Sequence, residues 1–148
     1  MVDKKLVVTN IVSIIYYGEM LMLSSSLEDY IEAIAVLAGD SGYVHASTIS
    51  EYLSVKKSSV TAALKNLKKH NLIVYQPYKP IKLTLLGQER AVEILQRHTV
   101  LRDFFVHVLQ IEMEQANLAA CKIEHAIGAD ITEKLVNFVR DFKKERSI

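Results

Sequence analysis

The feature that most restricts the fold of this chain is a pair of helical patterns with a tight turn between them. Apolar residues recur at helical spacing over residues 46–53 and again over 58–70, and the turn 54–57 joins the two. Ser58 and Ser59 favour a helix start, so we expect them to cap the second helix. A short helix, a tight turn and a longer capped helix are typical of a helix-turn-helix.

The spacing of apolar residues changes after Asn71. Residues 72–75 and 81–84 predict two short strands, joined through a segment with prolines at 77 and 80. A hairpin directly after the second helix is the wing of a winged helix-turn-helix, a more specific pattern than the helix pair alone. With only 5 glycines and 2 prolines in 148 residues, we expect a mostly α-helical protein with a small β wing.

Positive charge is concentrated on this segment, although the whole chain has a net charge of only +1. Seven lysines and no acidic residue fall between Val55 and Lys82. A face that only keeps a protein soluble normally mixes both signs, so this pattern favours contact with the phosphates of double-stranded DNA. We expect the DNA contacts to come from Lys56, Lys57, Ser58, Ser59, Thr61, Lys65 and Lys79.

Two further clusters carry groups that could bind a metal. In the predicted helix that starts near Leu27, Asp29 and Glu32 lie at i and i+3 and share one flank. In the predicted helix 111–128, Cys121, Glu124 and His125 lie at i, i+3 and i+4. A thiolate, carboxylates and an imidazole are all donors that divalent transition metals accept. Taken alone, the acidic pair could be a solvated edge of its helix. The second cluster, taken alone, could be a buried thiol beside a surface Glu–His pair.

The remaining patterns predict the domain organisation. Long helices are expected over 84–109, 111–128 and 129–144. The first has apolar residues on more than one side, which indicates packing both on the DNA-binding part and on another helix or subunit. We therefore divide the chain into an N-terminal arm (1–23), a winged helix-turn-helix (24–90) and a helical metal-binding and dimerisation domain (91–148). Met20 and Met22 offer an alternative start, and on this hypothesis residues 1–19 would be extraneous to the native protein.

Composition limits the location of the protein. A single cysteine excludes an internal disulfide framework and fits a reducing cytoplasm. No apolar stretch approaches the roughly 18–20 residues that a bilayer span needs. We expect a cytoplasmic protein that has no membrane partner and no small-molecule substrate.

Four stretches in this order resemble the diphtheria toxin repressor and manganese transport regulator family of metal-dependent regulators. They are Leu27–Glu32, Ser58–Thr61, Arg97–His98 and the pattern Cys-x-x-Glu-His that starts at Cys121. The resemblance implies an N-terminal winged helix-turn-helix joined to a helical dimerisation domain, with metal bound between them. It also implies a homodimer that binds operator DNA and represses transcription.

Carried over by position, the resemblance nominates six metal ligands: Asp29, Glu32, His98, Cys121, Glu124 and His125. Five of them match the manganese branch of the family, and Cys121 matches the iron branch. Carboxylates suit Mn²⁺, whereas a thiolate shifts preference toward later metals. We therefore expect Fe²⁺ or Mn²⁺, with Zn²⁺ third.

Two other functions stay open on the sequence. A winged-helix regulator could sense a small molecule, or the oxidation of Cys121, in place of a metal. A metal enzyme would need a substrate pocket and a general base that no motif supplies, so we expect no enzymatic activity.

Overall fold

The computed structural model describes residues 23–147 of the chain, so the predicted arm lies outside the described residues except for Leu23. The elements are α2 (Ser25–Ala38), η1 (Gly39–Ser41), α3 (Ala46–Tyr52), α4 (Lys57–Lys69), β1 (Ile73–Val74), β2 (Lys82–Leu83), α5 (Leu85–Asp103), η2 (Phe104–Val108), α6 (Met113–Ile123), η3 (Glu124–Ala126) and α7 (Ala129–Arg146). The predicted fold class, mostly helical with a small wing, is confirmed. Among the described residues, no helix combines the length and apolar character that crossing a bilayer requires.

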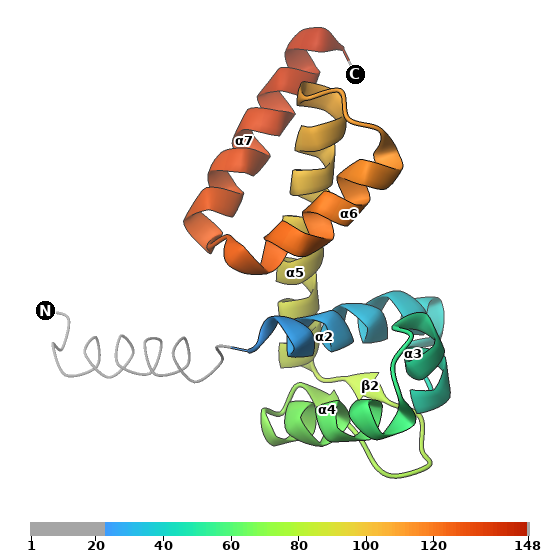
Figure 1. Cartoon of the computed structure of the whole chain (residues 1–148). Coiled ribbons are helices and arrows are strands. Elements are labelled where there is room, and N and C mark those ends of the chain that lie inside the picture. The colour runs from blue at the N-terminus through green and yellow to red at the C-terminus, as the bar shows by residue number, and fades with distance from the viewer. Residues whose placement is uncertain (1–22, 148) are drawn as a thin grey trace, which may run out of the picture.

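The first half forms a winged-helix body, defined here as α2, α3, α4 and the hairpin β1–β2 (Figure 1). Its core gathers side chains from each helix, among them the fully buried Ile34, Ile49 and Leu64. β1 and β2 pair antiparallel, with Ile73 opposite Leu83. The strands are shorter than predicted, because only two residues on each side form the ladder.

The predicted serine caps of the recognition helix α4 are wrong. The helix begins one residue earlier, at Lys57, and Lys56 is the cap residue with extended backbone. The backbone carbonyl of Lys56 accepts the amide N–H groups of Ser59 and Val60, so the helix starts without a side-chain cap. Ser58 and Ser59 lie exposed in the first turn of α4.

Gly87 fixes how the wing joins α5. A Cβ added at this residue would come 1.9 Å from the carbonyl oxygen of Leu72, so only glycine permits this approach. Thr84 caps α5 by accepting the amide of Gly87, and its hydroxyl donates to the carbonyl of Asn71. The wing is therefore fastened to the start of α5.

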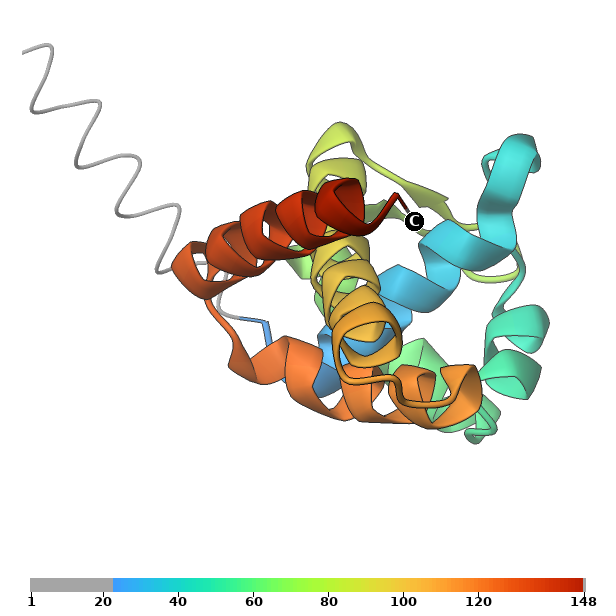
Figure 2. The same cartoon turned by 90° about the horizontal axis from the view of Figure 1, so that it is seen from above.

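Helix α5 belongs to both halves of the molecule (Figures 1 and 2). Ala91 and Ile94 pack into the core of the winged-helix body, whereas Val100 and Leu101 are buried in the half of α5 that contacts α6 and α7. The predicted boundary between residues 90 and 91 thus falls inside a continuous helix. The helix predicted over 84–109 is α-helical only as far as Asp103. It continues as a π-helical turn, η2.

The predicted helix 111–128 is wrong in its last part. α6 ends at Ile123, and the next three residues form the 3-10 turn η3. Gly128, which we expected to end this helix, directly precedes α7. Cys121 therefore lies on α6, while Glu124 and His125 lie on a tighter turn that directs them differently from a regular helix.

Candidate metal centre

The start of α2 brings its carboxylates to the C-terminal helices. The hydroxyl of Ser24 accepts the amide of Leu27 and caps the helix. Ile31 and Ile34 then bury one face of α2 in the winged-helix body. Asp29 and Glu32 lie on another flank of α2. This flank faces η3 and α5, because the two carboxylates lie close to side chains of those elements.

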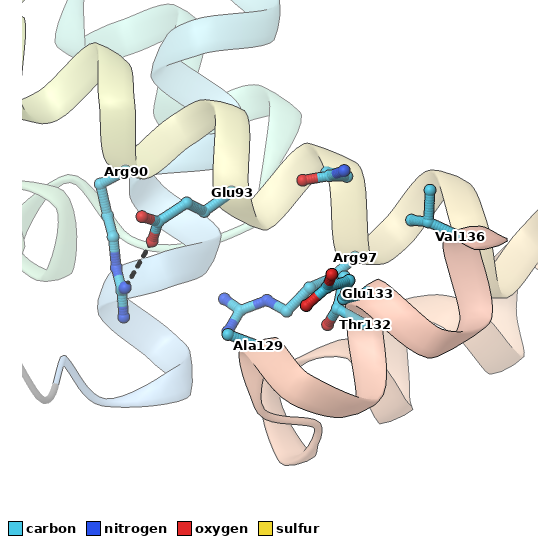
Figure 3. Close-up of a pocket in the computed structure, with 8 residues that line it drawn as sticks. Arg90, Glu93, Arg97, Ala129, Thr132, Glu133 and Val136 are labelled. Atoms are coloured by element: carbon cyan, nitrogen blue, oxygen red, sulfur yellow. Dashed lines mark hydrogen bonds and ion pairs between the residues drawn. The ribbon is translucent and has the colours of Figure 1, made fainter.

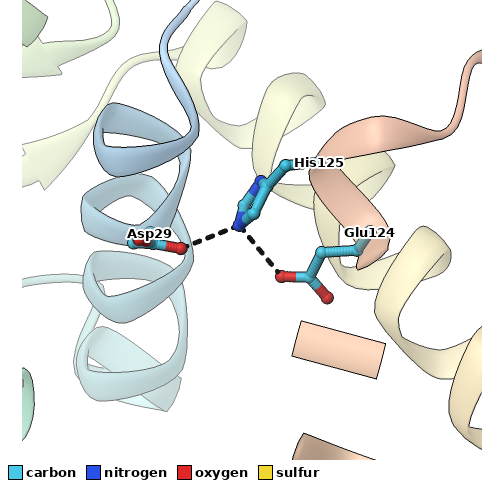
Figure 4. A group of neighbouring side chains, drawn as sticks. All are labelled: Asp29, Glu124 and His125. Carbon is cyan, nitrogen blue, oxygen red and sulfur yellow. Dashed lines mark hydrogen bonds and ion pairs between the residues drawn. The ribbon is translucent and has the colours of Figure 1, made fainter. Parts of the chain in front are cut away.

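Asp29, Glu124 and His125 form the first group of potential ligands, with their donor atoms within 4.8 Å of one another. Figure 4 shows His125 of η3 reaching toward Asp29 of α2, with Glu124 beside it. The Nε2 atom of His125 lies 2.8 Å from Oδ1 of Asp29 and 3.5 Å from Oε1 of Glu124. This group joins the winged-helix body to the C-terminal helices.

Glu32, His98 and Glu124 form the second group, again with donor atoms within 4.8 Å. The Nδ1 atom of His98 on α5 lies 2.6 Å from Oε2 of Glu124. Glu124 belongs to both groups and is fully buried. Its other oxygen, Oε1, has no hydrogen-bond partner among the described residues.

This buried oxygen tests whether a metal fits the residues present. A buried carboxylate oxygen without a hydrogen bond is costly, because it has lost water, and the ion pair with Nε2 of His125 at 3.5 Å replaces only part of that loss. Together with Glu124 itself, the two groups comprise three carboxylates and two imidazoles, a donor set that divalent metals accept. The residues therefore fit a divalent cation, and Glu124 could serve two ions at once.

The charges of the two groups act strongly on one another. Burial and the nearby charge of Glu124 raise the pKa of Glu32. The hydrogen bond with Glu124 raises the pKa of His98 despite its partial burial. Burial alone would lower the pKa of His125, but hydrogen bonding to Glu28 and the charge of Asp29 raise it. All three shifts oppose excess negative charge, the condition that a bound cation relieves.

Cys121 is the one predicted ligand that the structure does not bring into either group. The residue is exposed, although its thiol is partly screened from water. This partial burial and the charges of Glu124 and Asp29 raise the pKa of the thiol. A raised pKa disfavours the thiolate, the form of cysteine that reacts with oxidants and binds metal ions.

Sequence reasoning missed Glu28, the residue just before Asp29. Its carboxylate is buried and bonds to His125, Arg90 and Arg97. The available signal was the seven-residue spacing of the two arginines, because residues two turns apart lie on the same face of a helix.

Four of the seven predicted DNA-binding residues line a groove of about 450 Å³ between α4, the start of α3 and the wing. Lys57, Thr61, Lys65 and Lys79 line this groove. The hydroxyl of Thr61 donates to the carbonyl of Lys57, whereas Lys56, Ser58 and Ser59 are exposed beside the groove. Among the other residues that line the groove, and that the sequence did not single out for DNA contact, are His45 and the fully exposed Tyr78 of the wing tip.

Comparison with known families matches nearly all of the described chain. The domain described as "Iron dependent repressor, N-terminal DNA binding domain" matches residues 22–81. The domain described as "Iron dependent repressor, metal binding and dimerisation domain" matches residues 84–146. Together with the fold, these matches define a metal-dependent, DNA-binding transcription regulator.

The chain belongs to the iron-dependent repressor family, in the two-domain form that unites DNA binding with metal binding and dimerisation. It is a metal-dependent transcriptional repressor and not an enzyme. The two domains imply operator DNA and a second copy of the chain as partners. The resemblance inferred from the four sequence stretches is therefore confirmed.

Relatives of similar length support this assignment. An uncharacterised HTH-type transcriptional regulator of Methanocaldococcus jannaschii is 34% identical over 122 residues, which cover 82% of this chain and 98% of the relative. The HTH-type transcriptional regulator MntR of Bacillus subtilis is 30% identical over 124 residues, covering 84% and 87%.

Solved structures share the fold. The crystal structure of T. acidophilum IdeR matches with a TM-score of 0.66 and 25% identity, covering 74% of this chain and 52% of that one. A manganese-dependent transcriptional repressor in complex with manganese matches with a TM-score of 0.70 and 20% identity, covering 76% and 52%. This chain thus spans about half the length of these two solved chains.

Proposed function

We propose that this protein represses transcription when a divalent cation binds between its winged-helix body and its C-terminal helices. The observation that carries this proposal is the convergence of Asp29 and Glu32 from α2 with His98, Glu124 and His125 from α5 and η3. A ligand set shared in this way links the position of α2 to that of the dimerisation helices.

Fe²⁺ or Mn²⁺ is the ion we propose, with Zn²⁺ third. The two groups offer only carboxylate and imidazole donors, and carboxylates suit Mn²⁺. Among similar solved structures, a manganese-dependent transcriptional repressor in complex with manganese carries that metal in its title, and a structure titled ScaR with bound Zn²⁺ shows the same fold. Cys121 stays a predicted ligand on the sequence pattern alone, because its thiol belongs to neither group.

When bound, the cation would supply positive charge against the three carboxylates. Asp29 and Glu32 could then hold α2 against η3 and α5 without repelling Glu124. Because α2 packs on α3 and α4, a fixed α2 fixes the recognition helix α4 in each subunit. In a homodimer the two α4 helices would then match successive major grooves, about 34 Å apart.

The residues around α4 and the wing would make the DNA contacts. Lys56, Lys57, Lys65 and Lys79 would bind backbone phosphates, because their ammonium groups are exposed on one side of the body. Ser58 and Ser59 would donate from their hydroxyl groups to phosphates or base edges, and Thr61 would do the same by exchanging the bond that its hydroxyl donates to the carbonyl of Lys57. The division of the chain into a DNA-binding domain (24–90) and a metal-binding and dimerisation domain (91–148) also stays a prediction.

Operator binding with and without metal tests the proposal. Fragments of the source genome would be selected on the purified protein under anaerobic conditions, with Mn²⁺, Fe²⁺ or a chelator present. We expect metal to raise operator affinity about 5- to 150-fold, the range of ordinary allosteric coupling. Asp29→Ala should lose this gain, whereas the exposed Glu133→Ala on α7 should keep it.

Cys121→Ala, assayed in parallel, decides whether the thiol belongs to the ligand set. Loss of the metal response would place the thiol among the ligands, and an intact response would leave the two carboxylate and imidazole groups as the whole site. Full metal-dependent binding by both the Asp29→Ala and Cys121→Ala variants would contradict the proposal.

A further inference from the structure

Glu28 is a buried carboxylate of α2 that directly contacts two other elements of the fold. It lies in the first turn of α2 and is only 4% exposed. Its Oε1 accepts a hydrogen bond from Arg90 at 2.8 Å, and its Oε2 accepts from Arg97 at 2.8 Å. The same Oε2 lies 2.8 Å from Nδ1 of His125 on η3. One carboxylate therefore joins α2, α5 and η3.

The geometry excludes Glu28 from the ligand set itself. Three nitrogen atoms already occupy its two oxygens, and it belongs to neither group of potential ligands. Its neighbour Asp29 instead meets the opposite nitrogen of the same imidazole, Nε2 of His125, at 2.8 Å. The two consecutive acidic residues thus hold the two sides of one histidine ring.

We propose that Glu28 is a positioning residue that binds the Nδ1–H of His125 and so presents the Nε2 lone pair to the metal. This inference rests on the proposed metal site and adds a residue to it. A histidine that binds metal through one nitrogen donates from the other, and the acceptor fixes both the tautomer and the ring orientation. In this chain the acceptor comes from the winged-helix body, so the ring orientation depends on where α2 lies.

Arg90 and Arg97 hold the acceptor in place. They lie seven residues apart, hence about two turns apart on one face of α5. Both line a cavity of about 510 Å³ between α5 and the start of α7 (Figure 3). The two guanidinium groups therefore hold the carboxylate of Glu28 from α5, at both of its oxygens.

Glu28→Gln tests this role, with Co²⁺ as the probe metal. We expect Co²⁺ to bind with unchanged stoichiometry but about 10- to 100-fold more weakly, as for other residues that support a metal-binding histidine. In the Co²⁺-loaded protein, the exchangeable Nδ1 proton of His125 should give a paramagnetically shifted NMR signal that exchanges faster with water in the variant. His125→Gln would assign that signal by its loss.

Glu93→Gln is the matched control. Glu93 also pairs with Arg90, at 2.8 Å, but it is exposed and does not contact His125. This variant should bind Co²⁺ like the wild type. If Glu28→Gln does not fold, Arg97→Gln carries the test, because it keeps the carboxylate and removes one of its anchors. We expect a loss of about tenfold for that variant.

The outcomes separate this inference from the function on which it rests. The positioning role alone would be overturned by one combination of results. In it, the wild-type protein binds Co²⁺ through Asp29, and neither Glu28→Gln nor Arg97→Gln changes the Co²⁺ affinity or the exchange of the Nδ1 proton. Wild-type protein that binds no Co²⁺ would overturn the metal site together with it.

Discussion

Glu124→Gln should abolish the stabilisation of this protein by metal while leaving the metal-free fold intact. Glu124 is fully buried, belongs to both groups of potential ligands and has one oxygen without a hydrogen-bond partner. Glutamine keeps the size of the side chain and an acceptor for His98, but it removes the negative charge that a cation needs. The variant therefore separates metal binding from packing.

The expected magnitude follows from linkage between binding and folding. A cation present at 100 times its dissociation constant stabilises the wild type by about 2.7 kcal/mol per filled site. The unfolding entropy of 148 residues is about 0.31 kcal/mol per kelvin at about 2.1 cal/mol/K per residue. The melting temperature should therefore rise by about 9 °C for each site that fills.

Thermal melts followed by circular dichroism, with and without Mn²⁺, measure this difference. Glu124→Gln should show little or no rise, and the exposed Glu133→Gln should behave like the wild type. A wild-type rise that persists in Glu124→Gln would refute the shared carboxylate. The absence of any rise in the wild type with Mn²⁺, Fe²⁺ or Zn²⁺ would refute the metal site.

Three further predictions concern DNA binding, pH and stability. Lys65→Ala should weaken binding to all DNA sequences about equally. In filter binding, it should also reduce the slope of log affinity against log salt concentration by the equivalent of roughly one phosphate contact. Lys144→Ala on α7 should change neither the affinity nor the slope. The raised pKa of His98 contributes stability that is complete below its unfolded value of 6.5 and is lost as pH rises through the folded value. Urea midpoints of the metal-free protein should therefore fall from neutral to alkaline pH, and His98→Asn should flatten that decline. Asp103→Asn removes the ion pair between Asp103 of α5 and Lys143 of α7, and it should lower the free energy of unfolding in urea by about 1 kcal/mol. The exposed Asp141→Asn should be close to neutral. Equal effects of the two variants would contradict a stabilising role for the Asp103–Lys143 pair.

The fold was predictable because each part has a local signal. The helical spacing over 58–70, the change of spacing after Asn71 and the lysine cluster all depend on residues close in sequence. The exact helix ends were less predictable. Lys56, not a serine, caps α4, because backbone acceptors and packing decided the start of this helix.

The metal centre was only partly predictable for a related reason. Its residues come from α2, α5 and η3, and the helical spacing within 111–128 wrongly placed Cys121, Glu124 and His125 on one regular face. The 3-10 turn that redirects the last two residues has no sequence pattern distinct from a helix end. Glu28 was overlooked because its role depends on arginines more than 60 residues away.

The continuity of α5 makes the protein sensitive to the length of that helix. One residue inserted between Ile94 and Arg97 would turn the two ends of the helix by about 100° relative to each other and move them apart by about 1.5 Å. Arg97 and His98 would then point away from α2, so the ligands and their anchors would lose register together. Insertions and deletions among homologues should accordingly fall in the wing tip and in the segment between η2 and α6, and not inside α5.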